Sequence, residues 1–175
     1  MAPSEEPSWP DGKWHLLIAG AIGTCTRHDD RVGATGMCGE GTLGADFPWH
    51  FLLVRNLSVE LGIGSTVGAT SGNRDYGTSR TSNGPYGTVR VLLGWDLAPL
   101  LFLRAGPQVR VTWAQATAAP GVVLVVDTGT RLGRRAEVGL RAFAGADGVI
   151  RANAAETRLD TALAFGAAAY ARVFF

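Results

Sequence analysis

Residues 163–175 read LAFGAAAYARVFF, and their side chains alternate between two kinds along the segment. One face carries Leu163, Phe165, Val173 and Phe175, whereas the other carries small residues together with a tyrosine and Arg172. Alternation with a period of two puts successive side chains on opposite faces of an extended chain. The segment is therefore predicted to be a β-strand with one apolar face.

The same alternation recurs upstream in seven more segments, and no segment has the period of an amphipathic helix. The eight predicted strands are Trp14–Cys25, Thr42–Val54, Ser58–Thr70, Tyr86–Leu97, Leu100–Trp113, Val122–Leu132, Ala136–Ala146 and Arg158–Phe175. An all-β fold follows from this pattern.

The connections between these segments alternate in length. Tight turns are predicted at 55–57, 98–99 and 133–135, and longer polar loops at 26–41, 71–85, 114–121 and 147–157. Short turns at one end and long loops at the other are typical of an up-and-down meander, which predicts an eight-stranded antiparallel barrel. The first 12 residues, MAPSEEPSWPDG, precede the barrel and contain no apolar stretch of a signal peptide.

The face opposite the apolar one carries balanced charges, six acids and six arginines, interleaved with glycine and alanine. These residues are Asp46, Glu60, Arg90, Asp96, Arg104, Arg110, Asp127, Arg131, Glu137, Arg141, Asp160 and Arg172.

Two orientations fit this pattern. In a soluble, lipocalin-like barrel the apolar face lines a pocket, whereas in a membrane barrel it faces lipid. A water-facing surface of small residues and sparse, balanced charges is unusual, but small residues around paired arginines suit a narrow, filled lumen. We therefore predict a membrane barrel and keep the soluble ligand-binding barrel as an alternative.

Aromatic residues gather near the strand ends, as in the interfacial belts of membrane proteins. Trp14, Trp49, Trp95 and Phe175 fall near the turn end, and Tyr86 and Trp113 fall near the loop end.

Composition excludes other classes. Of 175 residues 46% are hydrophobic and 18% charged, which is too apolar for a disordered chain. The formal net charge of +1 lacks the basic footprint of a nucleic-acid binder. No apolar run reaches the roughly 20 residues of a membrane-spanning helix.

With its strand count, loop asymmetry and terminal strand, the chain from Lys13 to Phe175 resembles the eight-stranded outer-membrane barrels of the OmpA-type and OmpX-type. The resemblance implies a bacterial outer-membrane location, contact with membrane lipid and lipopolysaccharide, and recognition of the C-terminal strand by the barrel-assembly machinery. In that oxidising location, Cys25 and Cys38 are predicted to form a disulfide rather than two buried thiols.

The resemblance does not choose a function, because this fold serves anchoring, adhesion, lipid-A chemistry and small channels. No histidine is followed by serine two residues on, and no G-x-S-x-G occurs, so we expect no catalysis and no cofactor. His28-Asp29-Asp30 could ligate a metal, but adjacent ligands on a loop are usually solvated, so we expect no metal. We expect a monomer with a lumen plugged by its charges; a narrow ion channel is the alternative. Arg74, Tyr76 and Arg80 are the candidate loop residues for binding sugar or lipopolysaccharide.

Pro48 and Pro107 fall inside predicted strands, where proline removes a ladder hydrogen bond. Each is predicted to mark a bulge or a strand end. A bulge at Pro107 would reverse the facing of Gln108 and Arg110.

Overall fold

The computed structural model describes residues 13–28, 33–51, 53–71, 84–114, 117–152 and 157–175. Eight strands account for nearly all of them, and no helix in this described part is long and apolar enough to cross a membrane. The strands are β1 (His15–His28), β2 (Gly33–Phe51), β3 (Val54–Ser71), β4 (Gly84–Asp96), β5 (Leu101–Ala114), β6 (Thr117–Arg131), β7 (Ala136–Ala152) and β8 (Thr157–Phe174).

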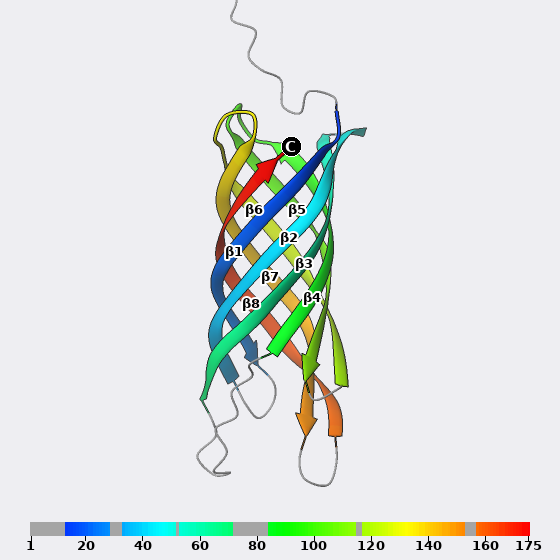
Figure 1. Cartoon of the computed structure of the whole chain (residues 1–175), viewed down its shortest axis with the longest axis vertical. Helices are drawn as coiled ribbons and strands as arrows, with labels where there is room; N and C mark the ends of the chain where they lie inside the picture. Colours follow the sequence, from blue (N-terminus) through cyan, green and yellow to red (C-terminus); the bar gives the residue numbers. More distant parts are fainter. Residues whose placement is uncertain (1–12, 29–32, 52, 72–83, 115–116, 153–156) are drawn as a thin grey trace, which may run out of the picture.

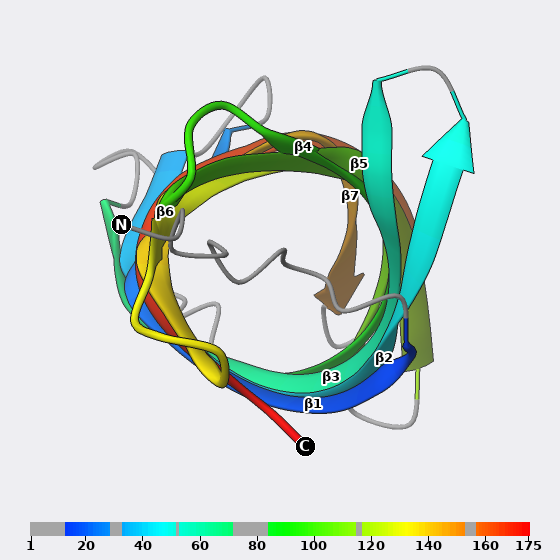
Figure 2. The same cartoon turned by 90° about the horizontal axis from the view of Figure 1, so that it is seen from above.

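Each strand pairs antiparallel with its neighbours in sequence, and β8 closes the barrel on β1. The predicted eight-stranded antiparallel barrel is thereby confirmed. Figure 1 shows the strongly tilted strands, with the start of β1 and the C-terminus at the same end. That end, which also holds the short connections, is called the turn end below, and the opposite end is called the loop end. Figure 2 looks down the axis from the turn end.

Several strands are longer than predicted at the loop end. β2 begins at Gly33, and residues 33–41, predicted as loop, pair with both β1 and β3. β6 begins at Thr117 and β7 continues to Ala152, so most of the predicted loops 114–121 and 147–157 are also strand. The alternation of large apolar residues fades there, which is why the sequence resembled loop.

One turn was also misplaced. Residues 55–57 lie within β3, and Asn56 pairs with Gly94 of β4, so the connection to β2 lies earlier, between Phe51 and Val54. The turns between β4 and β5 and between β6 and β7 are where the sequence predicted them. Gly133, with φ of 73°, supplies the left-handed conformation in the second of these.

The two prolines differ in their effect. The β2–β3 register shifts between Pro48 and Phe51, as predicted for a bulge. Pro107 pairs with Leu124 of β6, and the β4–β5 register is the same on both sides of it. Gln108 and Arg110 consequently keep their inward orientation and are buried.

The two faces of the barrel wall differ in polarity. Large apolar side chains point outward on every strand: Leu61 is 60% exposed, Ile63 76% and Leu140 64%. Arg90, Glu60, Arg104 and other charged side chains lie buried inside. An apolar belt of this extent is not stable against water, but it suits a surrounding of lipid acyl chains. The soluble alternative with an apolar pocket is therefore wrong, because the interior is charged.

Candidate functional site in the barrel lumen

The middle of the lumen is organised around Glu60, which is fully buried. Arg90 Nε donates to Glu60 Oε2 at 2.7 Å, and Arg172 Nη2 donates to Glu60 Oε1. These residues come from three strands, β3, β4 and β8, so their side chains meet across the lumen rather than along one sheet edge. One carboxylate thus neutralises part of the charge of two buried guanidinium groups.

Further acids complete this middle layer. Arg90 also donates to Glu40, to Thr42 Oγ1 at 2.6 Å and to Gln108 Oε1 at 2.9 Å. Arg141 forms a bidentate ion pair with Asp127, in which Nε donates to Oδ1 at 2.7 Å and Nη2 donates to Oδ2 at 2.8 Å. Bidentate arginine–carboxylate pairs fix the orientation of the guanidinium plane and neutralise its charge.

A second cluster lies toward the turn end. Arg104 binds both oxygens of Glu137 at 2.6 and 2.9 Å, and Arg131 Nη2 lies 2.6 Å from Asp96 Oδ1 at the rim. Buried Asp46 accepts hydrogen bonds from Asn56 Nδ2 at 2.7 and 2.9 Å. Its partner Asn56 comes from the segment that the sequence had assigned to a turn.

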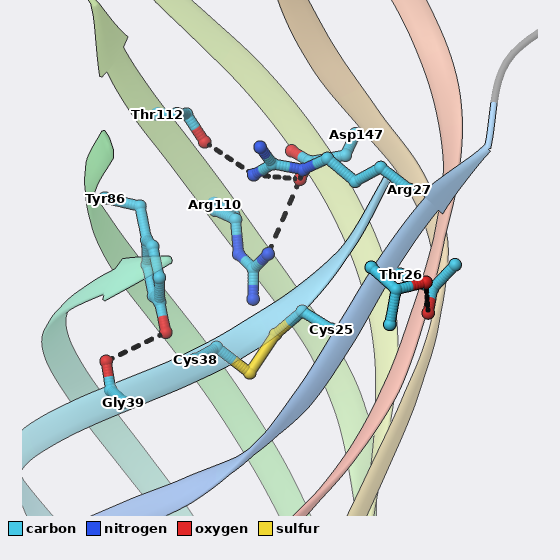
Figure 3. The surroundings of a disulfide bond; sticks show 10 residues. Cys25, Thr26, Arg27, Cys38, Gly39, Tyr86, Arg110, Thr112 and Asp147 are labelled. Atoms are coloured by element: carbon cyan, nitrogen blue, oxygen red, sulfur yellow. Dashed lines mark hydrogen bonds and ion pairs between the residues drawn. A yellow bond between two sulfur atoms is a disulfide. The ribbon is translucent and has the colours of Figure 1, made fainter. Parts of the chain in front are cut away.

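A third cluster lies toward the loop end, beside the disulfide, and Figure 3 shows it. Arg27 Nε donates to Asp147 Oδ2 at 2.8 Å, and Arg110 Nη1 lies 3.4 Å from the same oxygen. The Arg110 guanidinium lies 4.4 Å from the centre of the Tyr86 ring, in a cation–π contact. Two arginines therefore share Asp147 while an aromatic ring covers one of them.

The disulfide Cys25–Cys38 joins β1 to β2 inside the barrel, with a Cα–Cα distance of 5.9 Å. Both cysteines are buried, and they pack with apolar lumen residues that include Leu92 and Phe143. The predicted disulfide is thus present. It lies within the strands, not at the root of a free loop, because β1 and β2 continue past it.

The lumen is nearly filled. A cavity of about 20 Å³ lies among Glu40, Tyr86, Arg110, Arg141 and Phe143, next to Cys38. A space of this size holds about one water molecule. In the described part of the chain, the lumen thus resembles a packed ionic core rather than an open pore.

The structure brings together most of the charged residues that the alternation had pointed inward. Asp160 lies in β8, but its side chain is outside the described residues, as are all three candidate loop residues, Arg74, Tyr76 and Arg80. Sequence reasoning missed three charged lumen residues, namely Arg27, Glu40 and Asp147, because each fell in a predicted loop. Extending the alternation Cys38–Glu40–Thr42 backward along β2 would have revealed Glu40.

The aromatic residues divide between the two faces. Trp14, Trp49, Trp113 and Phe175 are exposed on the outside, and Trp95 is half-buried there. Tyr86, predicted for the loop-end belt, was misassigned: it is 2% exposed and its hydroxyl donates to the Gly39 carbonyl inside the lumen at 3.2 Å.

No family model matches the chain, and no curated protein matches its sequence. Solved structures do match its fold. Neisserial surface protein A aligns over 91% of this chain and 97% of its own length, with a TM-score of 0.55 and 8% identity. The outer membrane protein OprG from Pseudomonas aeruginosa aligns over 92% and 95%, with a TM-score of 0.51 and 8% identity. The chain therefore has the fold of an eight-stranded outer-membrane β-barrel.

Proposed function

We propose that this protein is a monomeric, non-catalytic barrel of the bacterial outer membrane. Its lumen is a structural plug, and its outer loops bind sugar or lipopolysaccharide. The observation that supports it best is the inversion of polarity across the wall. Leu61 and its outward neighbours face the surroundings, whereas Glu60, the residue before it, is buried and paired with arginines.

Gel mobility tests the membrane barrel directly. Protein refolded in detergent and loaded unheated is expected to migrate differently from boiled protein, because the closed barrel resists unfolding by the gel detergent. A protein that folds in plain buffer and shows no mobility shift would contradict the proposal.

The plug is favoured over a narrow ion channel by the pairing inside the lumen. Arg141, for example, is held by Asp127 at 2.7 Å and lies 3.5 Å from Glu40, so an ion crossing the lumen would have to displace these pairs. Removing one partner of a buried ion pair destabilises a protein by several kcal/mol. We expect vesicle-inserted protein to give no steady conductance steps in planar bilayers. Reproducible steps from protein whose insertion has been verified would favour the channel.

For the binding role, the candidate residues remain Arg74, Tyr76 and Arg80, which lie outside the described residues. Arginine and tyrosine side chains bind phosphate and sugar groups, both of which lipopolysaccharide presents. The double variant Arg74→Gln/Arg80→Gln should weaken binding of lipopolysaccharide by the reconstituted barrel. The matched control is Arg134→Gln/Arg135→Gln, which removes the same charge from the turn end. Equal binding by both variants and the parent would count against this role.

The terminal strand β8 carries the proposed recognition by the assembly machinery, and Phe175, the residue that follows it, is 68% exposed. Phe175→Ser should lower the amount of barrel assembled in cells, while the purified variant still refolds in detergent. Normal assembly of the variant would contradict this part of the proposal.

A further inference from the structure

The hairpin between β2 and β3 extends beyond the barrel wall. The pairing of β1 with β2 ends at Asp46, and that of β4 with β3 ends at Asn56. Past these points Phe47 pairs only with Leu57 of β3, Pro48 pairs only with Asn56, and beyond the register shift Phe51 pairs with Val54. Figures 1 and 2 both show this end of the two strands turning away from the wall at the turn end.

The hairpin exposes large apolar and aromatic side chains. Phe47, Trp49, Phe51 and Leu53 are exposed to 39%, 44%, 64% and 81%, respectively. Phe47, before the register shift, lies on the outward row of β2 that includes Leu43, which is 63% exposed, so the exposed side chains of the hairpin adjoin the apolar surface of the wall. Exposed apolar side chains that adjoin a lipid-facing wall are expected to contact lipid.

The backbone of the hairpin, in contrast, excludes a position in the hydrocarbon core of the membrane. In the described chain, no strand pairs with the outer edges of Phe47–Phe51 and Val54–Arg55. Strand edges without partners are not tolerated in the hydrocarbon core, where nothing satisfies their N–H and C=O groups. The hairpin must therefore contact lipid without lying in the hydrocarbon core.

The headgroup layer meets both requirements. Water and lipid headgroups satisfy backbone edges there, and tryptophan is enriched at this level of membranes. The polar side chains of the hairpin fit the same layer, because His50 and Arg55 are both exposed. A guanidinium binds phosphate with strong, charge-assisted hydrogen bonds.

We propose that the β2–β3 hairpin is a lateral membrane anchor that lies in the phospholipid headgroup layer, with Arg55 binding lipid phosphate. The proposal rests on the membrane location proposed above and adds a specific lipid contact to it. Phospholipid is the occupant of this surface; a partner strand pairing with the open edges would instead leave the hairpin in water until that partner bound.

A spin label at position 53 tests the depth of the hairpin. Leu53→Cys gives one reactive thiol, because Cys25 and Cys38 are buried and joined to each other. The matched control is Arg134→Cys in the β6–β7 turn, which is exposed at the same end of the barrel. In vesicles of phosphatidylcholine with phosphatidylglycerol, the label at 53 should be several-fold more accessible to oxygen, relative to a water-soluble nickel complex, than the label at 134.

Equal accessibility of the two labels in inserted, heat-modifiable protein would overturn the anchor while leaving the membrane barrel intact. Failure of the protein to insert at all would overturn both. The double variant Trp49→Ser/Phe51→Ser alters only side chains outside the wall, so the barrel should still shift on boiling. In that background the label at 53 should move into water; an unchanged depth would overturn the role of the aromatic residues.

The phosphate contact has its own test. Native mass spectrometry of the parent should show retained phosphatidylglycerol, and Arg55→Gln should lose more of it than Arg134→Gln. Equal retention by the two variants would overturn the role of Arg55.

Discussion

Glu60 and Arg90 face each other directly across the β3–β4 ladder, and their side chains form a 2.7 Å ion pair with no access to water. Register and alternation together produce this contact, since both residues occupy inward positions of adjacent strands. Arg172 reaches the same carboxylate from β8, so this pair ties opposite parts of the barrel together.

Replacing Glu60 should therefore destabilise the barrel strongly. Glu60→Gln leaves Arg90 and Arg172 without their shared carboxylate, and removing one partner of a buried ion pair costs about 3–5 kcal/mol. Urea unfolding in lipid vesicles, followed by tryptophan fluorescence and gel mobility, measures the loss.

The control for this variant is Asp96→Asn at the rim. The Asp96 side chain is 27% exposed, and its partner Arg131 also lies 3.5 Å from Glu137. Partly exposed pairs contribute about 0–1 kcal/mol, so the rim variant should lose far less stability. Equal losses for Glu60→Gln and Asp96→Asn would mean that the lumen is hydrated.

An arginine introduced on the outward face should destabilise the barrel, because its charge would lie in lipid. Leu61 lies near the middle of β3, 60% exposed, between outward Leu43 and Val89 of the neighbouring strands. Leu61→Arg should cost about 2–4 kcal/mol near the bilayer midplane, whereas Leu100→Arg, in a turn, should cost about 0–1 kcal/mol. The same vesicle-based unfolding measures both, and a neutral result for Leu61→Arg would place this face in water.

The architecture was predictable from the sequence because a lipid-facing wall imposes a strict period of two. Leu61 and Glu60 illustrate this, since adjacent residues of opposite polarity can both be accommodated only on opposite faces of one strand. Where the strands pass beyond the apolar belt, that constraint weakens. Residues 33–41 include four glycines, pair fully with both neighbours, and yet have the composition of a loop.

The partners inside the lumen were less predictable. Alternation shows that Glu60 and Arg172 point inward, but only barrel closure brings β3 and β8 side chains to one point. The position of Asn56 was missed because Arg55-Asn56 has the composition of a turn, whereas here its amide group binds Asp46. Pairing across the lumen depends on the stagger of the strands, which a single sequence does not display.

The disulfide should increase the stability of the barrel, but the barrel should fold to the same structure without it. Cys25 and Cys38 are 13 residues apart, and closing a loop of this length restricts the unfolded chain by about 3 kcal/mol in the loop-entropy model. Protein refolded with reductant should keep its β-sheet circular dichroism spectrum but unfold at lower urea. Cys25→Ala/Cys38→Ala should unfold like the reduced parent and no longer respond to reductant. A response that persists in the double variant would exclude the disulfide as its cause.

Close approach of the strands should make one inward glycine indispensable. A Cβ added at Gly106 would lie 1.9 Å from the backbone oxygen of Val91, and backbone cannot move aside as a flexible side chain can. Gly106→Ala should therefore push β5 from β4 and cost about 1–3 kcal/mol or more, as overpacking does. At Gly20, on the outward face, an added Cβ meets nothing within 4 Å, so Gly20→Ala should be neutral or slightly stabilising. Refolding yield and urea midpoint in vesicles compare the two variants, and equal behaviour would contradict the tight β4–β5 contact.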